Sequence, residues 1–426
     1  MKSVAKVTKE FLLIEIWDYL LIFMIVALTV LGRDGFPVAE LALAIPLVMQ
    51  FIVPGRSPYL PLSRIDLVFG FLALQYFVLH WFIAISYPLN NDPIQARWIE
   101  YPHAWAIAML LMVLVFWRFT MIRNLQHLWR YMAPAGLIFS FLVLSIDYFT
   151  AFRGSECRVS GYVFNPTVPP VFFTIFTIGS FFGWAGFTKG QRLLRYLLVV
   201  MAVIVTTAYA GARMTLLVQI FAFGLLSLIL PARDTKERIQ LVAVLGGLGV
   251  LGVAIGLGFD IIADCSFAKR LSLMVEVAGE PAEPGQNSIS IRIDLAKQAL
   301  ALMAQNPWTG FGISAEKLIA APEYHIHNQY FSWMIWGGVI SLISGTAYLV
   351  SPSIALLISP TRDGLILSLA ISGIIAVNSI SDSLLYHDYV NVEFILALGL
   401  FYGLGRCVWA KTGKANSDLN KSAEVY

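Results

Sequence analysis

Long apolar blocks separated by short breaks constrain this chain more than any other feature. Blocks such as Leu20–Leu31, Ala104–Trp117 and Leu241–Phe259 extend to about 17–25 residues, the length that a helix needs to cross hydrocarbon. A membrane β-barrel would instead show alternating segments of about ten residues. The chain is 58% hydrophobic and only 13% charged, whereas soluble domains carry roughly 25% charged residues. We therefore predict an all-α integral membrane protein.

The apolar pattern predicts about twelve transmembrane helices in a single polytopic membrane domain over residues 1–426. The first block contains Glu15 and Asp18 and lacks a small-residue cleavage site, so we expect a signal anchor. No internal repeat or soluble domain is apparent. The predicted spans are 11–31, 37–53, 66–87, 103–119, 131–150, 167–187, 193–209, 213–230, 240–259, 328–359, 365–383 and 391–410.

The distribution of Lys and Arg predicts the orientation of these spans. With the N-terminus in the cytoplasm, 19 of the 29 basic residues fall in inner segments and 5 in short outer segments. The remaining 5 lie in one long outer loop, and long loops escape the positive-inside rule. We expect both termini to be cytoplasmic. The inner bias accounts for the net charge of +3, and no nucleic-acid-binding pattern is present.

The long outer loop covers residues 260–327, between the ninth and tenth predicted spans. After a Pro- and Gly-rich stretch, Ser288 and Ser290 begin a helical pattern that ends at Asn306-Pro307. This pattern predicts an amphipathic helix on the membrane surface or packed on the bundle. Its expected apolar stripe is Ile289, Ile293, Ala296, Leu300 and Met303.

Two arginines occupy unusual positions. Arg292 interrupts the apolar stripe of that helix, and Arg213 begins the eighth predicted span at its outer edge. Each is compatible with an interfacial arginine that snorkels to the headgroups. Each is also compatible with a guanidinium directed into the protein at an anionic ligand, because charges at such depth usually face a cavity or a partner.

A histidine motif directly precedes the tenth span. In His325-Ile326-His327-Asn328-Gln329, the positive end of the helix dipole favours the neutral imidazole that a general base requires. Either histidine is also compatible with a structural role.

Further polar candidates lie in the other outer loops. Arg158 precedes a turn at Asn165-Pro166, and could equally be a loose surface arginine. Cys157 and Cys265 both fall in outer loops. The sequence is compatible with a disulfide between them and with two unpaired thiols. Asp382, His387 and Asp388 could bind substrate or form a turn.

Taken together, four segments resemble the bacterial O-antigen ligase and polymerase superfamily, which also includes exopolysaccharide polymerases. They occur in the order and with the spacing of that family, across residues 158–345. Asn306 stands where the family usually has histidine, and Ser341 departs from the ligase pattern. The segments are Arg158…Gly161…Asn165-Pro166, Arg213 with Leu216, Arg292…Asn306-Pro307…Gly310-Phe-Gly312, and His327-Asn328-Gln329…Gly337-Gly338.

The resemblance implies a GT-C-like glycosyltransferase of the bacterial inner membrane with a periplasmic active site and no cofactor. Its donor would be a glycan on undecaprenyl diphosphate, and its acceptor lipid A–core or another glycan, for lipopolysaccharide or exopolysaccharide synthesis. Arg213, Arg292 and Arg158 would bind the diphosphate, and His327 would be the catalytic base, supported by Asn328 and His325. The outer loops contain no DxD motif or metal-ligand spacing, so we expect no metal.

Three alternatives remain open. Polymerisation of lipid-linked repeat units is hard to separate from ligation, which we favour slightly because only one outer loop is large. A flippase or other transporter would place charges near the midplane and show inverted repeats. A non-enzymatic scaffold protein would give no functional role to His327 or to the three candidate arginines.

Overall fold

The computed structural model describes residues 18–31, 64–86, 125–150, 167–262, 288–313, 315, 326–357, 361–386 and 393–406. The described part of the chain is entirely helical and contains no strand. A short helix, Asp18–Leu31, precedes α3, and a last helix covers residues 393–406. The elements between them are α3 (Arg64–Ser86), α6 (Leu125–Thr150), α7 (Val168–Gly179), η1 (Trp184–Gly186), α8 (Lys189–Ile204), η2 (Val205–Tyr209), α9 (Arg213–Ile229), α10 (Thr235–Ile262), α12 (Ser288–Gln305), α13 (Gln329–Leu357), α14 (Arg362–Ser368), η4 (Leu369–Gly373), α15 (Ile374–Asn378) and η5 (Leu384–Tyr386).

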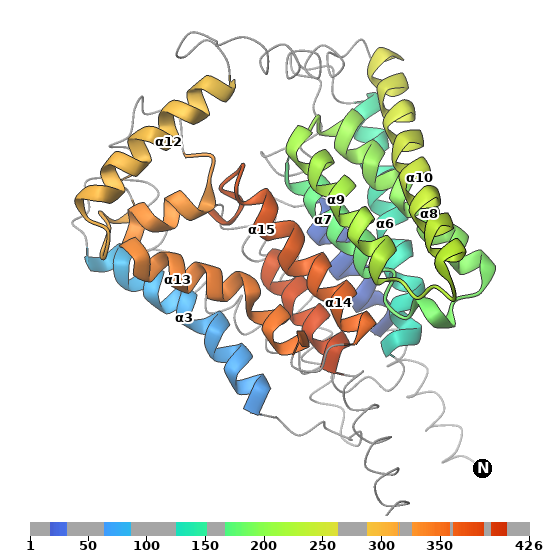
Figure 1. Cartoon of the computed structure of the whole chain (residues 1–426), viewed down its shortest axis with the longest axis horizontal. Coiled ribbons are helices and arrows are strands. Elements are labelled where there is room, and N and C mark those ends of the chain that lie inside the picture. Colours follow the sequence, from blue (N-terminus) through green and yellow to red (C-terminus); the bar gives the residue numbers. More distant parts are fainter. Residues whose placement is uncertain are drawn as a thin grey trace, which may run out of the picture.

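Two groups of helices lie on either side of a central rod formed by α14, η4 and α15. Figure 1 shows α3, α12 and α13 together on one side, and α6 to α10 on the other. Between them lie α14 and α15, joined by the π-helical turn η4 into one continuous rod over residues 362–378. α9 and α15 pack against each other, as do α12 and α13. The N-terminus of α9 and the segment after α15 therefore belong to one end of the bundle.

Five described helices are long and apolar enough to cross a membrane. They are Arg64–Ser86, Gln126–Thr150, Lys189–Tyr209, Thr235–Phe259 and Gln329–Ile354. Each coincides with a predicted span, and the spans predicted at 37–53 and 103–119 lie outside the described residues. Their outer surfaces are apolar: Phe71, Val250 and Ile343 are 67%, 72% and 64% exposed. Such a surface suits lipid as the solvent, so the chain is a multi-pass membrane protein.

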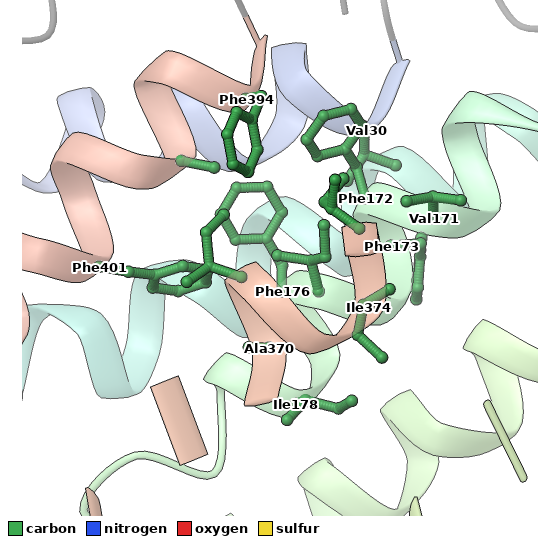
Figure 2. Packing of buried hydrophobic residues seen from close by; sticks show 14 of the residues in the cluster. Val30, Val171, Phe172, Phe173, Phe176, Ile178, Ala370, Ile374, Phe394 and Phe401 are labelled. Carbon is green, nitrogen blue, oxygen red and sulfur yellow. The ribbon is translucent and has the colours of Figure 1, made fainter. Parts of the chain in front are cut away.

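The helix α7 is buried over its whole length. All twelve residues of this helix are buried. Figure 2 shows Phe172, Phe173 and Phe176 of α7 packed against Ile374 of α15 and Phe401 of the last helix. A span over 167–187 was predicted, but α7 ends at Gly179, and the chain turns through Gly183 at φ 79°. The tight turn explains the early end, because this left-handed conformation favours glycine.

The buried face of α12 differs from the predicted stripe. The helix covers Ser288–Gln305, as the sequence predicts. However, Leu295 and Ala299 are buried, whereas Ile293 and Leu300 are about half exposed. The helix carries two apolar stripes, and the packing of α12 on α13 selects the one that contains Leu295 and Ala299. Residue 292 lies three positions before Leu295, so Arg292 borders this packed face.

Candidate functional site

The loop after α12 is locked into a break in α13. Gly337 and Gly338 leave the helical conformation, with φ of −142° and 64°. The loop supplies the hydrogen bonds that the broken helix lacks: the Phe311 amide donates to the Ile335 carbonyl (2.7 Å), and the Val339 amide donates to the Pro307 carbonyl (2.8 Å). Backbone groups at membrane depth need such partners.

Glycine is required on both sides of this contact. A Cβ atom on Gly310 would overlap the backbone of residues 335–338, and one on Gly338 would overlap the Trp308 carbonyl. Both glycines have positive φ, at 65° and 64°. The two motifs, Asn306–Gly312 and Gly337-Gly338, are therefore halves of one joint. This joint fixes α12 against the first turns of α13.

A pocket of about 240 Å³ opens where four segments meet at this end of the bundle. It lies between the N-terminus of α9, the start of α12, the N-terminus of α13 and the turn after α15. Arg292 and His327, two of the candidates from the long outer loop, both line it. The full lining is Met214, Arg292, Leu295, Ala296, Ile326, His327, Asn328, Phe331, Ile380 and Ser381.

The Arg292 guanidinium is exposed at the pocket and is oriented by one backbone contact. Its Nη1 donates to the Ser381 carbonyl at 3.1 Å. A guanidinium has five N–H donors, and among the described residues Arg292 has no carboxylate partner. The remaining donors are available to an anionic ligand.

Asn328 has a structural task that the sequence did not indicate. Its Oδ1 accepts hydrogen bonds from the amides of Tyr330 (3.0 Å) and Phe331 (3.1 Å), so it is the N-cap of α13. Its Nδ2 donates to the Ile380 carbonyl at 3.0 Å. Asn328 thus joins the start of α13 to the turn after α15, and fixes the residue directly before it, His327.

Asp382 lies beside His327. The Nδ1 of His327 is 3.5 Å from the Asp382 Oδ1, within ion-pair distance when the ring is protonated. The carboxylate is itself held, because its Oδ2 accepts a hydrogen bond from the Thr167 hydroxyl (2.9 Å) and its Oδ1 accepts one from the Ser383 amide (2.9 Å). The sequence left Asp382 open between substrate binding and a turn. No local signal could have paired it with His327.

The structure places the other candidates less directly. Arg213 begins α9 and is partly buried, and its neighbour Met214, but not Arg213 itself, lines the pocket. Arg158, His325, Cys157 and Cys265 lie outside the described residues, as do His387 and Asp388. Within the described ranges, no group of three or more His, Cys, Asp or Glu side chains could hold a metal ion.

The fold and the pocket define a class: a helical multi-pass membrane protein with a guanidinium and an imidazole in one pocket at an end of its bundle. Residues 196–344 match the O-antigen ligase family, and over this part the chain is similar to the enzymes of that family. The match includes α9, α12 and the N-terminal half of α13. Among curated proteins, none matches the chain. The family match supports glycan transfer of the O-antigen ligase or polymerase type, with lipid-linked glycan substrates and a place in the bacterial inner membrane.

Proposed function

We propose that this chain transfers a glycan from undecaprenyl diphosphate to an acceptor hydroxyl at the periplasmic face, with inversion and without a metal. The observation that carries the proposal is that Arg292 and His327 line the same pocket. A guanidinium suits the diphosphate and an imidazole suits the acceptor. The pocket, at about 240 Å³, is smaller than the roughly 300–1,000 Å³ of typical ligand sites. It suits the reacting headgroup, with the glycan and the lipid extending outward.

Arg292 is the main group for the leaving diphosphate. Its N–H donors other than Nη1 can bind phosphate oxygens in the bidentate geometry that guanidinium favours. Arg213 at the start of α9 and Arg158, in the outer loop predicted before the sixth span, are proposed to add positive charge around the donor. Stabilisation of the developing negative charge contributes ~3–4 kcal/mol per donor, by analogy with oxyanion-hole deletions.

His327 is the general base. As the acceptor hydroxyl oxygen forms a bond to the anomeric carbon, its proton passes to the His327 Nε2. The bond from the anomeric carbon to the phosphate oxygen breaks, and its electron pair leaves with the diphosphate. Because Nδ1 lies next to the Asp382 carboxylate, the positive charge that forms on the ring is stabilised. Attack from the side opposite the leaving group inverts the anomeric centre.

The proposed topology places this pocket in the periplasm. It has both termini in the cytoplasm, about twelve spans, one membrane domain and the loop 260–327 outside, in a GT-C-like arrangement. The 19 to 5 excess of inner Lys and Arg supports it. In this orientation Arg213, α12 and His327 all fall on the outer side.

The favoured acceptor is lipid A–core, so that the reaction is O-antigen ligation. The match to the His-Asn motif and the presence of one large outer loop support ligation over polymerisation of repeat units. Product analysis separates the two, because ligation yields glycan on lipid A–core and polymerisation yields a longer lipid-linked chain.

The test uses purified protein, a lipid-linked glycan donor and lipid A–core. Transfer should proceed unchanged in excess chelator, and His327→Ala should abolish it while expression and thermal unfolding stay near those of the unaltered chain. Lys297→Ala, an exposed change on α12, is the matched control and should retain full activity. Dependence on added Mn²⁺, or full activity in His327→Ala, would remove the mechanism.

A further inference from the structure

A second cluster of arginines lies at the opposite end of the bundle from the pocket. α8 begins there at Lys189 and runs toward Arg213 at the pocket end. The cluster surrounds the turn between α7 and α8. The guanidinium carbons of Arg130 and Arg195 lie 4.9 and 4.4 Å from the centroid of the Phe187 ring, and that of Arg192 lies 5.0 Å from Trp184.

Arg195 is an arginine with a structural role, because its guanidinium donates only to carbonyl groups of the fold. It is fully buried. Its Nε donates to the Ser180 carbonyl (3.2 Å), its Nη1 to the Gln191 carbonyl (3.2 Å), and its Nη2 to the Arg130 carbonyl. Every nitrogen of its guanidinium therefore has an acceptor within the fold.

Arg130 and Arg192 differ from Arg195 in this respect. The Nε atoms of both are buried and have no hydrogen-bond acceptor. Within the described ranges, neither guanidinium forms an ion pair with a carboxylate. An aromatic ring contacts each guanidinium group, and the Nε–H of each is left without an acceptor. Buried donors without acceptors are costly, more so when they are charged. Both residues are partly exposed, so an anion with several acceptor oxygens can contact their guanidinium groups from outside.

The surroundings of the two arginines indicate a lipid rather than a soluble anion. Tyr131 on α6 and Leu193 and Leu197 on α8 are 44%, 69% and 49% exposed. The Gln191 Nε2 donates to the Tyr131 hydroxyl at 3.1 Å and joins the two helices at this level. The cationic groups thus lie directly beside the apolar surface of α6 and α8, where acyl chains would run.

We propose that Arg130 and Arg192 bind the phosphodiester headgroup of an anionic phospholipid in the leaflet at this end of the bundle. Basic pockets between membrane helices on the cytoplasmic side bind such headgroups in other proteins. The acyl chains lie along Leu193 and Leu197. The site is separate from the pocket, so it does not depend on the proposed chemistry of His327 and Arg292.

The test measures lipid binding by native mass spectrometry of the purified chain in neutral detergent. Phosphatidylglycerol and phosphatidylcholine with the same acyl chains are titrated separately. The unaltered chain should bind phosphatidylglycerol at least about tenfold more tightly. The double variant Arg130→Gln/Arg192→Gln should bind it about 10–30-fold more weakly, since each cation near an anionic headgroup contributes about a fivefold factor.

The matched control removes the same charge at the same end of the bundle. Lys189→Gln/Lys236→Gln changes two exposed lysines and should retain the preference for phosphatidylglycerol. If the double arginine variant does not fold, Arg192→Gln alone should show about a fivefold loss.

Equal losses in the arginine and lysine variants, or equal binding of the two lipids by the unaltered chain, would overturn the proposal. Displacement of bound phosphatidylglycerol by millimolar inorganic phosphate would also overturn it, in favour of a soluble anion. This measurement does not involve glycan transfer. A negative result would therefore count against the lipid site alone and not against the proposed function.

Discussion

The Nδ1 of His327 and the Oδ1 of Asp382 lie 3.5 Å apart across the wall of the pocket, although the whole of α13, α14 and α15 separates them in sequence. The carboxylate is held from a third segment, because the Thr167 hydroxyl donates to its Oδ2. The ring of His327 is therefore oriented by groups at the starts of α7 and α13 and at the end of α15. With Nδ1 beside the carboxylate, Nε2 is the ring nitrogen left for the proposed acceptor hydroxyl.

Asp382→Asn should lower the rate of glycan transfer about 10–100-fold. The amide keeps one oxygen to accept from the Thr167 hydroxyl or the Ser383 amide, but it carries no charge to stabilise the positive ring that forms when His327 takes a proton. General-base catalysis contributes roughly 10²–10⁴ in rate. The measurement is the single-turnover rate with saturating donor. Asp294→Asn, on α12 and paired among the described residues with Lys297, is the control and should be unaffected. A full rate in Asp382→Asn would show that the carboxylate has no part in the reaction.

Arg292→Lys should lower transfer about 10–100-fold, and Arg292→Ala roughly 10²–10³-fold. Lysine keeps the charge but is a point donor, so the bidentate contact with phosphate is lost. Rates and donor affinities are measured separately, and the larger effect is expected on the rate because the leaving group gains charge as the bond breaks. If Arg292→Lys had the activity of the unaltered chain, charge alone would suffice and the geometry of Arg292 would be irrelevant.

Gly338→Ala should destabilise the protein by about 2 kcal/mol or more and reduce activity with it. Its φ of 64° disfavours any Cβ, and the added carbon would overlap the loop at Trp308. The readout is thermal unfolding in detergent together with transfer. Gly246→Ala in α10, where a Cβ meets no atom within 4 Å, should be neutral or slightly stabilising. Similar behaviour of the two variants would contradict the role assigned to the joint.

Two substitutions at Asn328 should separate its two tasks. Asn328→Ala removes the N-cap of α13 and should cost about 1 kcal/mol of stability. Asn328→Asp keeps an oxygen for the Tyr330 and Phe331 amides but loses the donor to the Ile380 carbonyl, so its loss of stability should come from the contact with the turn after α15 and not from the cap of α13. Its added negative charge should weaken donor binding, because the pocket is proposed to hold a diphosphate. Unchanged donor binding in Asn328→Asp would place the diphosphate elsewhere.

Local features of the chain could be predicted because their causes are local. The helix expected from Ser288 to the residue before Asn306 is α12, Ser288–Gln305, and the span expected at 213–230 is α9, Arg213–Ile229. Hydropathy over some twenty residues, capping residues and prolines determine such boundaries whatever surrounds them. One helix end was predicted wrongly: α7 ends at Gly179, well before 187, because the chain turns at Gly183.

The amino-acid sequence alone determined that the chain is an all-helical membrane protein, and it identified Arg292 and His327 as candidates. Only the tertiary structure decided that these two residues line one pocket, that Asp382 lies beside His327, and that Leu295 rather than Ile293 faces the bundle. The physical reason is that hydropathy and capping act within a few helical turns. Which faces of helices meet depends on how side chains from distant segments fit together, and glycines such as Gly310 and Gly338 allow that fit here.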